Sequence, residues 1–247
     1  MSRTFLKFLV PATLSALCAT AAIGCGSKGS GSDSAQPGAG PTPAAATPDI
    51  AGSYTVKGTN PGNSGDYSGS LVVTKRGDVY QFSWKTGATS YDGVGVQSES
   101  SIGVAFASGA EGNGCSVVQY KLGADGSLQG KWGQWGGNAA GTESATRSGG
   151  GTGVDGNYDV TGTRLDGKPY KGTLTVTPEG AGHLFAWSTG DASQGFGIQS
   201  GSFVSVGIGG GECGFVAYDV LPDGTLKGQW SSFKSKAIGT EVATKAK

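Results

Sequence analysis

The chain contains 247 residues, of which 48 are glycine, and its 18 basic residues balance its 18 acidic residues. A neutral balance argues against a protein that binds nucleic acid through its charge. The 5 Trp, 8 Tyr and 9 Phe argue against a disordered chain, and the glycines lack the three-residue period of collagen. Glycine combined with aromatic residues favours many short strands joined by tight turns, but it does not identify a ligand.

The N-terminal segment has the features of a secretion signal. Arg3 and Lys7 supply a positively charged start, and an apolar run follows over residues 8–23. This run is short and is interrupted by Pro11, which disfavours a membrane-spanning helix. We therefore expect residues 1–24 to be a signal peptide that is removed on export.

The end of this signal reads Ala-Ile-Gly-Cys at positions 22–25 and resembles the bacterial lipobox. The resemblance implies cleavage before Cys25 and attachment of a lipid to its sulfur; an ordinary signal peptide with a nearby cysteine is the alternative. Residues 25–49 then form a tether of Gly, Ser, Ala and Pro, a composition that stays flexible. We expect a lipid-anchored protein of the bacterial cell envelope, and Gly26 favours the outer membrane or the cell surface.

The rest of the chain is an internal repeat with units of roughly 100 residues. The first unit covers residues 50–146, the second covers 154–247, and a glycine-rich linker covers 147–153. The matched segments are 52–59 with 156–163, 67–74 with 170–177, 82–84 with 185–187, 93–98 with 195–200, 125–132 with 223–230, and 141–143 with 239–241. The chain therefore contains a duplicated domain.

Within each unit, apolar residues alternate with small or polar residues, which is the period of a strand with one buried face. In the first unit we expect about eight strands, which start near positions 52, 66, 79, 93, 101, 115, 127 and 140. An antiparallel meander of this length can remove its edges by closing into a barrel. We predict an all-β fold of two tandem eight-stranded antiparallel barrels, similar in kind to avidin and lipocalin barrels, with a sandwich of two sheets as the alternative.

Glycines inside the predicted strands fit a small barrel. The run Gly-x-Leu-x-Gly-x-Trp occurs at 126–132 and again at 224–230. A strand glycine permits sharp coiling and lets an aromatic ring lie over the bare backbone. A single membrane-spanning barrel is disfavoured, because the second row of these strands carries lysines such as Lys57 and Lys131.

The strand and turn motifs resemble short secreted bacterial proteins that are labelled fibronectin-binding. The resemblance rests on Gly-x-Tyr-x-Val-x-Gly-Thr-Asn-Pro-Gly at 52–62, Tyr-Ser-Gly at 67–69, Gly-Asp-x-Tyr-x-Phe-x-Trp at 77–84, Asp-Gly-x-Leu-x-Gly-x-Trp at 125–132, and Gly-Thr-Glu at 141–143. It covers both units. It implies an envelope protein with an adhesive role toward a matrix protein or a glycan.

Residues suited to catalysis are scarce. His183 is the only histidine, and Tyr80 stands at the matching position of the first unit, so we expect it to fill a strand position. A Ser–His–Asp arrangement and a histidine-based zinc site have no supporting signature. We expect no enzyme activity, no cofactor and no metal.

Two polar pairs and one aromatic set are candidate contacts inside or at the rim of the barrels. Glu143 and Glu241 match in the last strand of each unit, and Gln97 and Gln199 match in the fourth. Inward-pointing side chains would hydrogen-bond a buried partner or grip a ligand, and we favour the structural role. The aromatic set is Trp132 with Trp135 and its counterpart Trp230 with Phe233. These aromatics are candidates for a binding rim, with core packing favoured.

Cys115 and Cys213 occupy matching positions of the two units. Secreted compartments are oxidising, which favours a disulfide. Equivalent residues of two copies meet only near a pseudo-two-fold axis, so a bridge would determine how the barrels pack. The alternative is that each is a small buried thiol.

Together these features predict a non-catalytic binding or adhesion module that is held to the membrane by its N-terminal lipid. Its partner would be an extracellular protein or a glycan, nucleic acid is not expected, and the oligomeric state stays open. The alternative function is a periplasmic inhibitor of hydrolases or a carrier of a small apolar ligand. A carrier requires an open cavity in a barrel.

Overall fold

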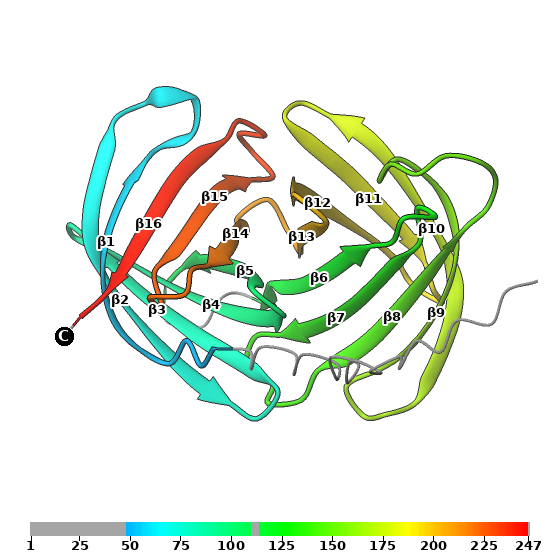
Figure 1. Cartoon of the computed structure of the whole chain (residues 1–247), viewed down its shortest axis with the longest axis horizontal. Helices are drawn as coiled ribbons and strands as arrows, with labels where there is room; N and C mark the ends of the chain where they lie inside the picture. Colours follow the sequence, from blue (N-terminus) through cyan, green and yellow to red (C-terminus); the bar gives the residue numbers. More distant parts are fainter. Residues whose placement is uncertain (1–47, 110–113, 247) are drawn as a thin grey trace, which may run out of the picture. The chain divides into compact units, whose positions relative to one another are not determined.

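The computed structural model describes residues 48–109 and 114–246. The described chain forms antiparallel strands that close into two eight-stranded barrels, which confirms the predicted fold class (Figure 1). Within these two ranges there is no helix with the length and apolar character needed to cross a bilayer. The expected signal peptide and the expected lipidation site Cys25 lie outside the described residues.

Barrel 1 combines the first five strands of the chain with the last three, and it closes where β1 pairs with β16. A short 3₁₀ turn, η1 (Pro61–Asn63), lies between its first two strands. The strands are β1 (Gly52–Thr59), β2 (Asp66–Arg76), β3 (Val79–Thr86), β4 (Thr89–Ser98), β5 (Ser101–Ser108), β14 (Gly214–Val220), β15 (Leu226–Ser232) and β16 (Gly239–Lys245).

Barrel 2 consists of the eight strands between β5 and β14. It is therefore one continuous stretch of chain, which is inserted in sequence between the fifth and sixth strands of barrel 1. It closes where β6 pairs with β13. The strands are β6 (Ser116–Leu122), β7 (Leu128–Gln134), β8 (Gly141–Arg147), β9 (Gly156–Thr163), β10 (Pro169–Glu179), β11 (Gly182–Ser188), β12 (Ala192–Ser200) and β13 (Phe203–Ile208).

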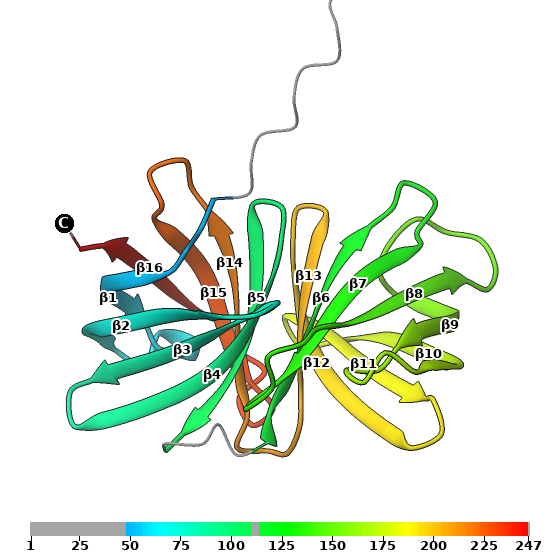
Figure 2. The ribbon, with the colours of Figure 1, turned by 90° about the horizontal axis from the view of Figure 1, so that it is seen from below.

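This strand order corrects the expected division into one barrel per repeat. Each barrel takes five strands from one unit and three from the other, so neither 50–146 nor 154–247 is a barrel. The expected linker 147–153 joins β8 to β9, which are hydrogen-bonded neighbours within barrel 2. The chain passes between the barrels at β5–β6 and β13–β14 instead, and Figure 2 shows these four strands meeting at the centre of the molecule.

The two repeats can exchange their last three strands because both repeats offer equivalent partners to the fifth strand of each unit. β5 pairs with β14 rather than with β6, and β6 pairs with β13. Both β6 and β14 present a valine and a tyrosine to a barrel interior, Val118 with Tyr120 and Val216 with Tyr218. Whether β5 pairs with β6 or with β14 therefore depends on the contacts that the outer faces of these strands bury. An exchange of identical elements between two units costs little free energy when the pairings are equivalent.

Apolar side chains on the outer faces of the central strands fill the junction between the barrels. One cluster joins β3, β4 and β5 of barrel 1 to β6 of barrel 2, and a second joins β12 to β14. A polar group is buried beside them: the Ser205 hydroxyl donates to the Gln119 side-chain oxygen, and Gln119 donates to Ser101 Oγ at 3.1 Å. Because these buried polar atoms are paired across the junction, they help to fix the register of the two barrels.

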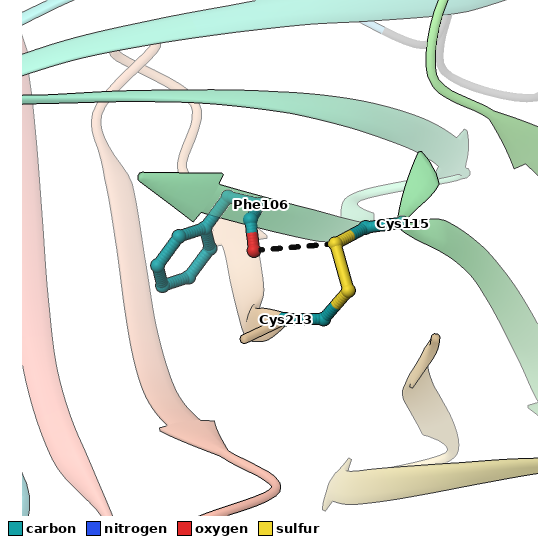
Figure 3. The surroundings of a disulfide bond; sticks show 3 residues. All are labelled: Phe106, Cys115 and Cys213. Carbon is teal, nitrogen blue, oxygen red and sulfur yellow. Dashed lines mark hydrogen bonds between the residues drawn. A yellow bond between two sulfur atoms is a disulfide. The ribbon is translucent and has the colours of Figure 1, made fainter. Parts of the chain in front are cut away.

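A disulfide joins the two segments at which the chain changes barrel. Cys115 precedes β6, Cys213 precedes β14, and both are buried. Figure 3 shows the bridge beside β5, with Cys115 Sγ 3.7 Å from the carbonyl oxygen of Phe106. Of the two possibilities that the matched positions left open, the structure therefore has the disulfide, and it links the two crossovers.

The strand glycines have the expected steric role. A Cβ atom on Gly130 or on Gly228 would lie 2.5 Å from the ring of Tyr120 or Tyr218, respectively. Only a bare backbone admits these rings, so the glycines allow large aromatic side chains to fill a narrow barrel.

One end of each barrel is closed by the residues that lead into β1 or β9. Ile50 is buried in barrel 1, where its carbonyl oxygen accepts a bond of 2.6 Å from the Tyr54 hydroxyl. Val154 is buried in the same way in barrel 2, where the Tyr158 hydroxyl donates to its carbonyl at 2.5 Å. The interior of each barrel is therefore reached from the other end, which we call the mouth.

Candidate functional site

A buried glutamate from the last strand of each repeat lies inside each barrel. Glu241, on β16, receives hydrogen bonds from three neutral donors: Tyr67 at 2.7 Å, Trp84 at 3.0 Å, and Tyr218. These donors come from β2, β3 and β14, so the carboxylate ties together strands from both repeats. Glu241 is only 6% exposed.

The same arrangement exists in barrel 2. Glu143, also 6% exposed, receives hydrogen bonds from Tyr170 at 2.7 Å, from Trp187 at 2.9 Å, and from Tyr120. The group is complete in both barrels, so both glutamates point inward and are hydrogen-bonded, as the structural interpretation expects. Buried carboxylates need such partners, since an unpaired buried charge is costly.

The burial of this group affects its proton affinities. Burial raises the pKa of Glu241, although the three hydrogen bonds to its carboxylate act in the opposite direction. Burial and the neighbouring carboxylate also raise the pKa values of the Tyr67 and Tyr218 hydroxyls well above their usual range. The two phenols therefore remain protonated donors at neutral pH.

The mouth of barrel 1 contains a cavity of about 460 Å³. Aromatic residues make up five of the twelve residues that line it, and Glu241 is the one charged residue among the twelve. The five rings are those of Tyr67, Trp84, Tyr91, Phe106 and Trp230. Cavities that take small ligands commonly measure ≈ 300–1,000 Å³ and combine apolar walls with a few polar groups.

The mouth of barrel 2 is narrower, with a cavity of about 180 Å³. Arg164 lies across it, with Cζ 5.5 Å from the centre of the Tyr170 ring and an Nη2 bond of 3.4 Å to the carbonyl of Thr189. Two wall positions also differ from barrel 1, with Ser193 in the place of Tyr91 and Ile208 in the place of Phe106. The two mouths therefore share a framework and differ in size and charge.

The predicted aromatic rim divides into two groups. Trp230 and Trp132 line the mouth cavities, and each indole nitrogen donates to a backbone carbonyl, that of Thr59 or Thr163, at 3.1 Å. Trp135 and Phe233 pack instead against the apolar cluster between the barrels. Of the candidate rim residues, only Trp132 and Trp230 therefore line a mouth, whereas Trp135 and Phe233 have the packing role that the sequence favours, because residues just beyond β7 and β15 turn toward the junction.

The predicted glutamine pair lies away from both mouths. Gln97 donates to the carbonyl of Pro48 at 3.1 Å, near the closed end of barrel 1. Gln199 is exposed and donates to the carbonyl of Gly201 at 2.9 Å. Neither residue lines a mouth cavity, so only the glutamate pair lies at the candidate site.

His183 lies at a strand position of β11, and its Nδ1 is 2.7 Å from a carboxylate oxygen of Asp155. Within the described ranges, no group of three or more His, Cys, Asp or Glu side chains is placed to hold a metal ion. The histidine therefore has a local partner at the closed end of barrel 2.

The residues that distinguish the two mouths are not among those that match between the repeats, so the sequence comparison of the repeats does not identify them. Asn60, Tyr91 and Phe106 in barrel 1 correspond to Arg164, Ser193 and Ile208 in barrel 2. The signal was present in the sequence as mismatches within an otherwise well-matched repeat.

Comparison with family models, with curated proteins and with solved structures finds no match to this chain. The geometry of the site is therefore the basis for its interpretation.

Proposed function

We propose that the chain is a non-catalytic binding protein of the bacterial cell envelope and that its ligand site is the mouth of barrel 1. The observation that carries this proposal is the cavity of about 460 Å³, whose wall holds five aromatic rings and one buried carboxylate. This feature favours a small organic ligand, and it supports the carrier function over the adhesive function expected from the fibronectin-binding resemblance.

A binding role also suits the chemistry of the carboxylate. Glu241 is surrounded by neutral hydrogen-bond donors, and no second carboxylate lines the cavity among the described residues. Hydrolysis of a glycosidic bond by general acid–base chemistry would need a paired acid. Attachment through a lipid on Cys25 remains a proposal that rests on the sequence motif at 22–25.

The test uses the neutral fluorescent probe phenylnaphthylamine and a pair of cavity-filling variants. Val216 lines the cavity of barrel 1, and Val118 is its counterpart in barrel 2. We expect Val216→Phe to weaken probe binding at least tenfold and Val118→Phe to leave it unchanged, as measured by fluorescence titration. Equal effects of the two variants would contradict a site in barrel 1.

A further inference from the structure

The mouth of barrel 1 has an electrostatic character that favours positive charge. The faces of aromatic rings carry negative potential, and five rings surround this cavity. The one charged group among the lining residues is the acidic Glu241. An organic cation gains from ring faces and from a nearby carboxylate at the same time, whereas an anion is repelled by both.

The rings form a connected wall rather than isolated contacts. Phe106 lies 5.4 Å from Trp84, 5.9 Å from Tyr91 and 6.1 Å from Trp230, as measured between ring centres. Trp230 lies in turn 6.1 Å from Tyr67, edge to face. Aromatic cages of this kind are a recurrent solution for binding quaternary ammonium groups.

The carboxylate has capacity for one more interaction. An ionised carboxylate offers about four acceptor positions. Oε1 of Glu241 accepts from Trp84 and Tyr218, and Oε2 accepts from Tyr67 alone. All three donors are neutral, so the negative charge is not balanced by a cation of the chain at this site.

Barrel 2 shows how the same framework accommodates a cation. The Arg164 guanidinium lies over the ring of Tyr170, the counterpart of Tyr67, and both residues line the mouth. In barrel 1 the matching position holds the neutral Asn60. Barrel 2 therefore supplies its own positive charge, whereas barrel 1 presents a wider aromatic mouth without one.

We propose that the mouth of barrel 1 binds a small organic ammonium ion, whose charged group lies among the five rings near Glu241. This inference rests on the proposed function and narrows the ligand to one chemical class. The cavity of about 460 Å³ admits an ion of the size of choline.

The test compares choline with dimethylbutanol, the neutral analogue in which a carbon atom replaces the choline nitrogen. We expect calorimetry on the whole protein to give choline at least a tenfold lower Kd. Glu241→Gln should weaken choline binding about tenfold and leave dimethylbutanol binding unchanged. The matched control Glu143→Gln, in barrel 2, should leave the binding of both probes unchanged.

A second variant protects the test against a folding defect in Glu241→Gln. Asn60→Arg places the cation of barrel 2 at the half-exposed edge of the barrel 1 mouth, and it should weaken choline binding at least tenfold. Equal affinity for choline and dimethylbutanol, or an equal effect of the two glutamate variants, would overturn the ammonium proposal. If phenylnaphthylamine also fails to respond to Val216→Phe, the proposed function itself is wrong.

Discussion

The two barrels have nearly the same interior and different mouths. Both keep a buried glutamate with two tyrosine donors and one tryptophan donor, so this group belongs to the architecture of the barrel. Barrel 1 has a wide aromatic mouth with one acidic group, whereas barrel 2 has Arg164 across a smaller opening. A duplicated fold can therefore retain its structural framework in both copies while the two mouths diverge in size and charge.

The largest expected effect is that of removing the disulfide. This change tests whether the two barrels, despite their different mouths, unfold as one cooperative unit. The bridge spans a sequence separation of 98 residues, and Cys115→Ser with Cys213→Ser should lower the free energy of unfolding by about 2–5 kcal/mol. Because buried apolar clusters and the Gln119–Ser101 hydrogen bond join the two barrels, we expect one cooperative transition in chemical denaturation. Separate transitions for the two barrels would contradict this coupling.

The next effect tests whether the buried glutamate is equally structural in both barrels. Tyr67→Phe and Tyr170→Phe each remove a 2.7 Å bond to a carboxylate. A hydrogen bond to a charged group contributes about 1.5–3 kcal/mol, and each variant should lose stability in this range in urea titrations. If only one variant is destabilised, the two glutamates do not share one role.

Transfer of the barrel 1 mouth residues to barrel 2 should create a second copy of the proposed site. Arg164→Asn, Ser193→Tyr and Ile208→Phe together give barrel 2 the mouth residues of barrel 1. We expect calorimetry with choline to change from one site to two, and the second site should disappear when Arg164 is restored. An unchanged stoichiometry in a folded variant would show that these three positions do not determine the difference.

The smallest expected effect is the pH dependence of choline binding. Burial raises the pKa of Glu241 above its ordinary value of 4.5, and the titratable groups that face it, Tyr67 and Tyr218, stay protonated. A cation favours the ionised carboxylate, so affinity should fall as the pH drops through the raised pKa, by about tenfold in total, which is the loss expected for Glu241→Gln. Glu241→Gln should show no such dependence.

The unliganded protein should respond to pH in the opposite direction. A carboxyl group whose pKa is raised in the folded state contributes stability that is present below its unfolded pKa. That contribution is lost as the pH rises through the folded pKa. The difference between wild type and Glu241→Gln in unfolding experiments should therefore shift toward lower wild-type stability as the pH increases.

The sequence predicts the strands and the repeat and marks the two glutamates as a matched pair, because period-two patterns and matched positions report local structure directly. Most strand starts agree with the pattern, and β4 begins at Thr89 rather than near 93 because the turn at Gly87, with φ of 60°, is tight. The exchange between repeats could not be predicted in this way. β6 and β14 offer equivalent inward faces to β5, and the choice depends on long-range burial of their outer faces.

The candidate site was only partly predictable for a related reason. Matched residues identify what the two barrels share, so they led to Glu143, Glu241, Trp132 and Trp230. The fully aromatic lining of the barrel 1 mouth includes Tyr91 and Phe106, which have no aromatic counterpart in barrel 2. A feature that only one barrel has, such as the aromatic mouth of barrel 1, is indicated by the positions at which the two repeats differ.

The sequence of barrel 2 is inserted into that of barrel 1, which sets the order in which the barrels can close as the chain emerges from its N-terminus. β1–β5 emerge first but cannot close without β14–β16. Barrel 2 is complete once Ile208 has emerged, whereas barrel 1 waits for the last strand, which ends at Lys245. Until then the early sheet has unpaired edges of the kind that promote aggregation, and the aromatic mouth is the last part of the molecule to form.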